Sequence, residues 1–194
     1  MGRRIRSGRE GLLRWIVRRR IGISVLGAVV FYLLASPSPA ALLMGTPVVF
    51  LGEALRTWAS GYLRKNETVC RSGPYRYIRH PLYLGNFFLG LGFVLMGGRM
   101  ELLPLYGLAF GCLYGATVRH EEERLRERFG AAYEAYRRQV PGWIPRRNPG
   151  PGGPEGFAWR LVWKHREHRT WLGILFGLSL MALRPWLPLS LWGS

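Results

Sequence analysis

The chain has 194 residues, of which 48% are hydrophobic, and its formal net charge is +17. A basic soluble domain of this size would suggest a nucleic-acid partner, but here the apolar and the charged residues occupy separate blocks. This segregation favours a membrane protein, with membrane lipids as the partner of its positive charge, over a nucleic-acid-binding protein. Of the two cysteines, Cys112 lies inside an apolar run and Cys70 in a polar stretch, so we expect no disulfide between them, and no metal-site spacing is present.

The N-terminal stretch combines strong positive charge with an apolar run. Residues 1–20 carry eight arginines and are followed by an apolar run over 21–35. This pattern imitates a signal peptide, but a second apolar run begins directly after Ser36-Pro37-Ser38-Pro39. We therefore expect a basic cytoplasmic segment over 1–20 and prefer an uncleaved first membrane helix to a cleaved leader.

Three further apolar runs predict membrane helices over about 40–63, 82–96 and 102–118. Glu53 and Arg56 lie three residues apart in the first of them, so they can pair on one helical face toward the bundle interior. A stripe of small residues recurs every four positions in the last run, at Gly107, Gly111 and Gly115. We interpret this stripe as a helix-packing face.

The rest of the chain is more polar. Residues 119–138 are typical of a charged helix outside the bilayer, and 146–156 form a linker rich in Pro, Gly and Arg. Residues 159–169 predict an interfacial helix anchored by tryptophans. A last apolar run over 171–183 is broken at Arg184-Pro185, and it either spans the membrane or lies partly embedded. The predicted fold class is thus all-α, an integral membrane bundle of four to five transmembrane helices.

Lysine and arginine are distributed unequally between the two ends of these helices. All of them except Arg99 and Arg184 fall in the N-terminus, in 56–80 or in 119–169, which lie on one side of the predicted bundle. The positive-inside rule places this side in the cytoplasm. In a prokaryote the membrane would be the inner, cytoplasmic one, and the polar groups described next would face the cytoplasm.

The most informative stretch is 72–85, whose sequence is SGPYRYIRHPLYLG. Pro81 suits the first turn of a helix, and a helix start attracts anions through its N–H groups and its dipole. Arg79 can bind a carboxylate with two hydrogen bonds, while His80 and Tyr83 add further hydrogen-bonding groups. The alternative is a juxtamembrane loop whose Arg and Tyr side chains lie among lipid headgroups.

This stretch, followed by a second motif that begins at Glu121-Glu122 and continues through Tyr133 and Tyr136 to Val140-Pro141, resembles the isoprenylcysteine carboxyl methyltransferase family, to which phospholipid N-methyltransferases are related. The resemblance covers roughly 40–147 and implies a membrane enzyme that holds S-adenosylmethionine at the cytosolic face. Transferred residue by residue, it implies cofactor contacts from Tyr75, His80, Pro81, Leu82, Tyr83 and Glu121. The chemistry agrees, since Glu121 suits the cofactor's ammonium or ribose hydroxyls and tyrosine faces suit its sulfonium.

The resemblance further implies methyl transfer to a lipid-like or prenylated acceptor, either a carboxylate or an amine. In the eukaryotic enzymes of the family, an arginine that meets the substrate lies four residues before the glutamate; here that position is Thr117, and the nearest arginine is Arg119. Our catalytic candidates are Glu122, Arg119 and Arg79, with Glu122 accepting the proton of an amine acceptor. We expect no metal.

The predicted domain organisation is a methyltransferase domain over 21–147, with its family-like core over 40–147, between the basic segment and a C-terminal part over 148–194. That part comprises the linker, the interfacial helix and the last hydrophobic segment. Two alternatives remain at this stage. One is a sterol-reductase-like membrane enzyme that uses NADPH, whose extra phosphate Arg71, Arg76 and Arg79 could bind. The other is a non-catalytic membrane protein.

Overall fold

The computed structural model describes residues 19, 22–65, 67–145, 147 and 149–186. In this part of the chain the regular structure is helical throughout, without a strand, which confirms the all-α class. Apart from Arg19, the expected basic segment over 1–20 lies outside the described residues, and so do the apolar residues after Trp186. The elements are a helix at Gly22–Leu34, α2 at Pro39–Ser60, η1 at Gly73–Arg76, α3 at Pro81–Met96, α4 at Leu102–Phe129, α5 at Ala131–Gln139, α6 at Trp159–Lys164, α7 at Glu167–Leu183 and η2 at Arg184–Trp186.

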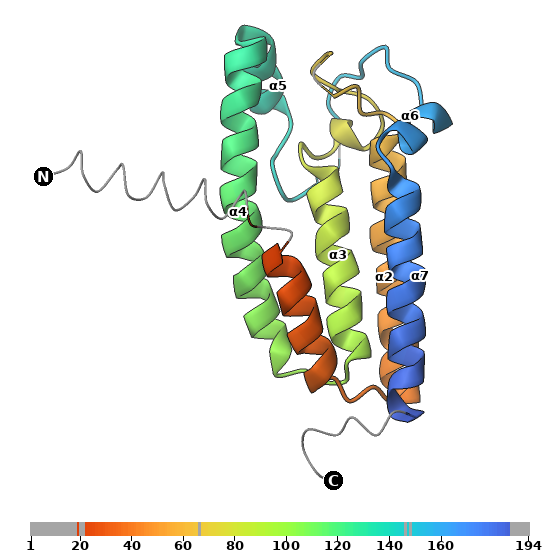
Figure 1. Cartoon of the computed structure of the whole chain (residues 1–194). Helices are drawn as coiled ribbons and strands as arrows, with labels where there is room; N and C mark the ends of the chain where they lie inside the picture. The colour runs from red at the N-terminus through yellow and green to blue at the C-terminus, as the bar shows by residue number, and fades with distance from the viewer. Residues whose placement is uncertain (1–18, 20–21, 66, 146, 148, 187–194) are drawn as a thin grey trace, which may run out of the picture.

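The long helices stand side by side, and the polar connections gather at one end of them. Figure 1 shows α2, α3, α4 and α7 running in the same long direction, with α5, α6 and the stretch before α3 together at the top. We call residues 61–80, between α2 and α3, the arm. The short turn between α3 and α4 lies at the opposite end. The molecule therefore has one loop-rich polar end, as the distribution of Lys and Arg predicts.

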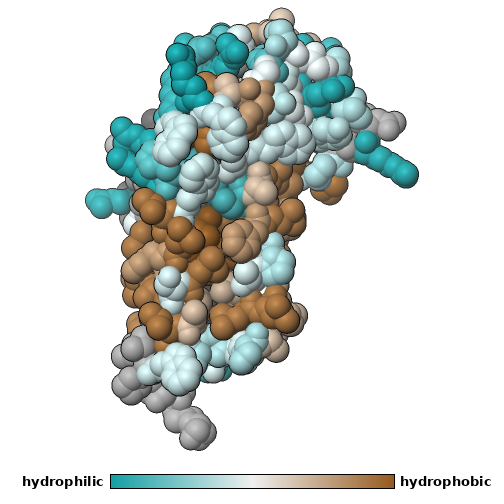
Figure 2. All heavy atoms as spheres, turned by 90° about the vertical axis from the view of Figure 1, so that its right-hand side faces the viewer, coloured by the Kyte–Doolittle hydropathy of each residue, from teal (hydrophilic) through white to brown (hydrophobic). Residues whose placement is uncertain are grey.

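The apolar surface fits a membrane protein. Figure 2 shows hydrophobic atoms over the lower part of the face formed by α2 and α7, and hydrophilic atoms over its upper part. Large apolar side chains are exposed along both helices: Leu43, Phe50, Leu51, Leu172, Leu175 and Phe176. Contiguous exposed apolar surface of this kind marks contact with lipid or protein.

Helix α2 is the one helix among the described residues that is long and apolar enough to cross a membrane, by length and composition alone. It begins where expected, because the Ser38 hydroxyl accepts a hydrogen bond from the Ala41 N–H at 3.2 Å and Pro39 takes the first helical position. The helix Gly22–Leu34 and α3 are apolar but shorter. The bundle of four to five membrane helices therefore remains a prediction.

Helices α2 and α3 pack with their backbones in contact. A Cβ atom built on Gly92 would lie 2.7 Å from the backbone nitrogen of Val49, and one on Gly52 would lie 2.6 Å from that of Leu89. Such distances leave room only for glycine. By contrast, a Cβ on any glycine of the stripe Gly107, Gly111 and Gly115 would meet nothing within 4 Å. The predicted packing face is thus not used within the described chain, and the close approach occurs at other glycines.

Two predicted helix boundaries were wrong. The fourth apolar run and the charged pattern after it form one continuous helix, α4, because both stretches favour helix and nothing between them breaks it. The break comes at Gly130, whose φ of +49° suits glycine, and α5 follows as a separate helix. Likewise the expected interfacial helix over 159–169 ends at Lys164, because Arg166 adopts a left-handed conformation and α7 starts at Glu167.

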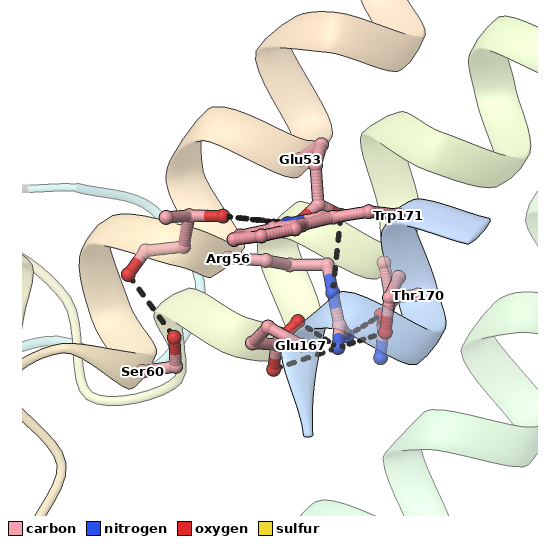
Figure 3. Close-up of polar contacts among 8 residues, drawn as sticks. Glu53, Arg56, Ser60, Glu167, Thr170 and Trp171 are labelled. Atoms are coloured by element: carbon pink, nitrogen blue, oxygen red, sulfur yellow. Dashed lines mark hydrogen bonds and ion pairs between the residues drawn. The ribbon is translucent and has the colours of Figure 1, made fainter. Parts of the chain in front are cut away.

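A buried polar cluster joins α7 to α2 and α3 (Figure 3). Arg56 donates hydrogen bonds from Nη2 to both oxygens of Glu167, at 2.8 and 3.0 Å, and from Nη1 to the side-chain oxygen of Asn86. Glu53 accepts a hydrogen bond from the Trp171 indole at 2.6 Å and lies 3.7 Å from Arg56 Nε. The expected pairing of Glu53 with Arg56 is therefore present, but the closer partner of Arg56 comes from the C-terminal helix. Removing one partner of a buried ion pair is costly, so this cluster fixes α7 to the bundle.

Candidate functional site

A cavity of about 500 Å³ lies at the polar end, between the arm, the start of α3, α4 and α5. Its volume falls in the range of small-molecule and cofactor pockets, roughly 300–1,000 Å³. The residues that the sequence assigns to the cofactor all line this cavity: Tyr75, His80, Pro81, Leu82, Tyr83 and Glu121. The arm residues from Thr68 to Cys70 line it as well.

The arm and α4 meet through direct side-chain contacts. The Tyr83 hydroxyl donates a hydrogen bond to Glu121 Oε2 at 2.6 Å, and His80 Nε2 lies 3.0 Å from Glu122 Oε1. His80 is 5% exposed, so its ring is held inside the protein. The two motifs, about 40 residues apart in sequence, thus meet on one side of the bundle, as the sequence argument requires.

Glu122 is held by two residues of the arm, Arg79 and His80. Its Oε1 atom accepts hydrogen bonds from His80 and, at 2.8 Å, from Arg79 Nη2. The hydrogen bond from His80 and the positive charge of Arg79 lower the pKa of Glu122 to about 2, against the opposing effect of its burial. An ionised carboxylate can only accept, so the shared proton lies on His80 Nε2. In this geometry Glu122 holds His80 in place, and its expected role as the base for an amine acceptor stays a prediction.

Arg79 holds a carboxylate, as expected, but the carboxylate belongs to the protein. Its Nη2 atom donates to Glu122. Its Nη1 atom donates to the carbonyls of Arg137 at 3.0 Å and Val140 at 2.9 Å. Its backbone N–H donates to the carbonyl of Pro141 at 2.9 Å. Arg79 lines the cavity, yet its hydrogen bonds fasten the arm to α4 and to the end of α5.

Arg119 does not join this group. Its side chain is exposed, and it is not among the residues that line the cavity. Thr117, at the position of the family's substrate-binding arginine, is 4% exposed and donates its hydroxyl to the carbonyl of Leu113 at 2.9 Å. The geometry therefore brings together Arg79, His80, Glu121 and Glu122 and leaves Arg119 outside.

The start of α3 offers fewer hydrogen-bond donors than its sequence suggests. Pro81 has no N–H, and the N–H groups of Tyr83 and Leu84 both donate to the carbonyl of His80 at 3.1 Å. The N–H of Leu82 is then the main backbone donor that the first turn can offer to an anion.

Sequence reasoning missed several residues that line the cavity, among them Arg124, Leu125 and Arg128 on α4 and Tyr133 and Tyr136 on α5. A signal was present, since the three α4 residues share a helical face with Glu121 at spacings of three, four and seven. Burial raises the pKa of Tyr133 and of Tyr136, so both remain neutral hydroxyls. The Tyr136 hydroxyl donates to the carbonyl of Tyr75 at 2.8 Å and so fixes a cavity-lining residue.

Among the described residues, no three His, Cys, Asp or Glu side chains come together in a way that could hold a metal ion.

Comparison with known proteins gives the site its context. The profile of the isoprenylcysteine carboxyl methyltransferase (ICMT) family matches residues 43–127, a range that contains the arm, α3 and most of α4. No solved structure matches the chain.

Two bacterial relatives match most of the chain. The cobalt-zinc-cadmium resistance protein CzcN of Cupriavidus metallidurans is 34% identical over 151 residues, which are 71% of this chain and 68% of that protein. The nickel-cobalt-cadmium resistance protein NccN of Alcaligenes xylosoxydans xylosoxydans is 31% identical over 144 residues, 68% of this chain and 67% of that protein.

A eukaryotic relative has a named reaction. The protein-S-isoprenylcysteine O-methyltransferase of Schizosaccharomyces pombe is 30% identical over 103 residues, 53% of this chain and 44% of that protein. Members of this family are integral membrane proteins, which agrees with the apolar α2 and its exposed face. The family profile falls on the segment that builds the cavity, and relatives match the chain well beyond it, so the chain belongs to the isoprenylcysteine carboxyl methyltransferase family of membrane methyltransferases.

Proposed function

We propose that this protein transfers the methyl group of S-adenosylmethionine to a lipid-like or prenylated acceptor at the cytosolic face of the membrane. One observation carries the proposal: the cavity between the arm and α4 is lined by all six residues that the family resemblance assigns to this cofactor. Membership in a family of membrane methyltransferases supports the type of reaction.

The residues of the cavity fit S-adenosylmethionine group by group. The N–H of Leu82 can donate to the cofactor's carboxylate, and so can Nδ1–H of His80 in its imidazolium form, since Nε2–H is already bound by Glu122. Glu121, oriented by the Tyr83 hydroxyl, suits the ammonium or the ribose hydroxyls. The ring faces of Tyr75 and Tyr83 suit a sulfonium, with an attraction of about 0.5–2 kcal/mol. When bound, this cofactor supplies a methyl carbon on a positively charged sulfur.

The chain's own contribution to the reaction is alignment and exclusion of water. Holding the acceptor in a near-attack pose can supply about 7–11 kcal/mol of the barrier reduction. A carboxylate acceptor needs no base. For an amine acceptor, the ion-paired Glu122 is a poor base, so we assign to Glu122 and Arg79 the task of orienting His80, and the amine would enter as the neutral form.

The acceptor's apolar tail would approach from the bilayer between α3 and α4. A row of aromatic rings bridges these helices and leads to the cavity: ring centroids lie 5.2 Å apart for Phe87 and Phe110, 4.2 Å for Phe110 and Tyr114, and 5.4 Å for Tyr114 and Tyr83. Such rings offer apolar contact to a hydrocarbon chain. We further propose that four to five helices span the membrane with this end in the cytoplasm, because the arm and 119–169 carry most of the Lys and Arg that follow the N-terminal segment.

The names of the two bacterial relatives state a resistance to metals and no reaction. They therefore say nothing against methyl transfer, and the proposal takes its chemistry from the family and from the cavity.

Binding of S-adenosylmethionine to the purified protein in detergent, measured by calorimetry, tests the proposal. His80→Ala and Glu121→Ala should each abolish binding while the helix content by circular dichroism stays unchanged. Glu123→Ala is the matched control, because Glu123 is exposed on the same helix and does not line the cavity. Normal binding by both cavity variants would show that the assigned pocket is wrong.

The same titration with NADPH tests the reductase alternative. That alternative needs a site for an extra phosphate, but Arg71 and Arg76 donate to the carbonyls of Ala132 and Gly150 and do not line the cavity. Arg79 is held by Glu122. These contacts engage the three arginines that the alternative named for the phosphate, and micromolar affinity for NADPH would reverse the choice.

A further inference from the structure

After α5 the chain returns to the arm and runs along it. We call residues 149–158 the strap. Near its start, the Gly150 N–H donates to the carbonyl of Arg76 at 2.9 Å, and Arg76 Nε donates back to the carbonyl of Gly150 at 3.0 Å. At its end, the Ala158 N–H donates to the carbonyl of Gly61 at 2.9 Å. The strap thus follows the arm from its first residue to η1, yet no strap residue lines the cavity.

Glu155 is the strap's charged contact with the arm. Its Oε2 atom lies 2.8 Å from the Ser72 hydroxyl, and its Oε1 atom accepts a longer hydrogen bond of 3.5 Å from the Thr68 hydroxyl. Ser72 is 4% exposed and stands at the N-cap of η1, but its side chain makes no capping bond there. Its hydroxyl also lies 2.8 Å from the Gly153 carbonyl, so its single proton is shared between two acceptors on the strap.

The two residues that Glu155 contacts bracket a wall of the cavity. Thr68 lines the cavity together with Val69 and Cys70, and Ser72 begins the short helix that carries Tyr75 into it. Tyr75 is held from the other side by Tyr136, through its carbonyl. Two hydrogen bonds therefore hold this wall, one from Tyr136 of α5 and one to the carboxylate of Glu155 in the strap.

The strap can hold the arm because it is itself anchored. Helix α7, which follows it after α6, is fixed to the bundle by the buried pair of Arg56 and Glu167 (Figure 3). A second carboxylate also links the arm to the C-terminal part, since Glu67 lies 3.3 Å from Lys164. Both side chains of that pair are more than half exposed, and exposed ion pairs contribute little to stability.

We propose that Glu155 is a positioning residue for the cofactor cavity: by holding Ser72 and Thr68 from behind, it keeps the arm in the shape that binds S-adenosylmethionine. The inference rests on the proposed function, because it takes that cofactor as the ligand. It extends the site to a residue outside the segment that matches the family profile. The C-terminal part of the chain is then a working part of the site and not only a membrane anchor.

The test compares three variants by calorimetric titration with S-adenosylmethionine in detergent. Glu155→Ala should raise the Kd about tenfold, the effect of losing one hydrogen bond to a charged group. Glu155→Gln keeps an acceptor oxygen for Ser72 and should restore binding to near the wild-type Kd. Glu67→Ala, a control that removes the exposed ion pair between the arm and α6, should bind like the wild type. Recovery by the amide distinguishes positioning through this hydrogen bond from general loosening of the fold.

The outcomes separate the two claims. Failure of the wild type to bind S-adenosylmethionine would overturn the proposed function. Normal wild-type binding with an unchanged Kd in Glu155→Ala would overturn the positioning role alone, and so would equal losses in the alanine and glutamine variants. If Glu155→Ala does not fold, Ser72→Ala provides the second measurement, and it should raise the Kd by a similar factor; an unchanged Kd there would also refute the inference.

Discussion

One carboxylate, Glu122, holds the two halves of the candidate site together. One of its oxygen atoms accepts hydrogen bonds from the imidazole of His80 and the guanidinium of Arg79. Arg79 also donates to the carbonyl of Val140 at the end of α5. The other carboxylate of the motif, Glu121, meets a tyrosine hydroxyl and lines the cavity. Two adjacent acidic residues therefore have different surroundings, because Glu122 contacts Arg79 and His80 of the arm and Glu121 lines the cavity.

The lowered pKa of Glu122 predicts how stability depends on pH. Its pKa in the folded protein is about 2, below the ordinary value of 4.5, so its ionised form stabilises the fold above about pH 4.5. That contribution should be lost as the pH falls from about 4.5 toward 2. Thermal unfolding in detergent across this range should show a steeper loss of midpoint for the wild type than for Glu122→Gln. Glu123→Gln is the exposed control, and parallel curves for the wild type and Glu122→Gln would contradict the assignment.

At the scale of single residues, the sequence predicted which side chains gather at the site better than what each of them does. Five of the six cofactor candidates lie on the arm and on the helix start that follows it, and the sixth, Glu121, lines the same cavity from α4. The chemical role of Glu122 stays a prediction, because a carboxylate acts as a base or as a clamp according to its neighbours. Those neighbours, His80 and Arg79, lie about 40 residues away in sequence.

At the scale of elements, the contact between α2 and α3 depends on glycines of both helices. Gly92→Ala should lower the thermal unfolding midpoint, because its Cβ would lie 2.7 Å from the Val49 backbone nitrogen and overpacking costs about 1–3 kcal/mol. Gly107→Ala is the matched control: nothing lies within 4 Å of its Cβ, and alanine is the better helix former by about 1 kcal/mol. The control should be neutral or slightly stabilising. An equal loss in both variants would contradict the packing.

Helix α4 shows why a periodic glycine pattern does not by itself identify a helix–helix contact. The stripe at Gly107, Gly111 and Gly115 has the regular spacing, yet it meets no other part of the described chain. The glycines that do allow close approach, such as Gly52 and Gly92, stand on two different helices. Whether a small residue faces a neighbour is decided by how the helices are arranged, and spacing within one helix carries no information about that.

At the scale of the whole molecule, the polar end is predicted to face the cytoplasm. In a variant without Cys70 and Cys112, a cysteine at the exposed Glu67 should react with a membrane-impermeant maleimide only after sealed right-side-out vesicles are opened. A cysteine at the exposed Met100, in the turn between α3 and α4, should react in sealed vesicles. The reverse pattern would place the cavity on the outer face and refute the cytosolic site.

The sequence by itself determined the helical class, the starts of α2 and α3 at their prolines, the polar end, the family and the identity of the cavity-lining motif. These follow from local rules. Proline and serine define helix starts, apolar runs define lipid-facing helices, and a motif is recognised from the order and spacing of its residues. The tertiary structure alone decided the pairing of Arg56 with Glu167, of Glu122 with His80 and of Glu155 with Ser72. Each of these pairs joins segments at least 42 residues apart, and such contacts depend on how complete helices pack, which no local pattern encodes.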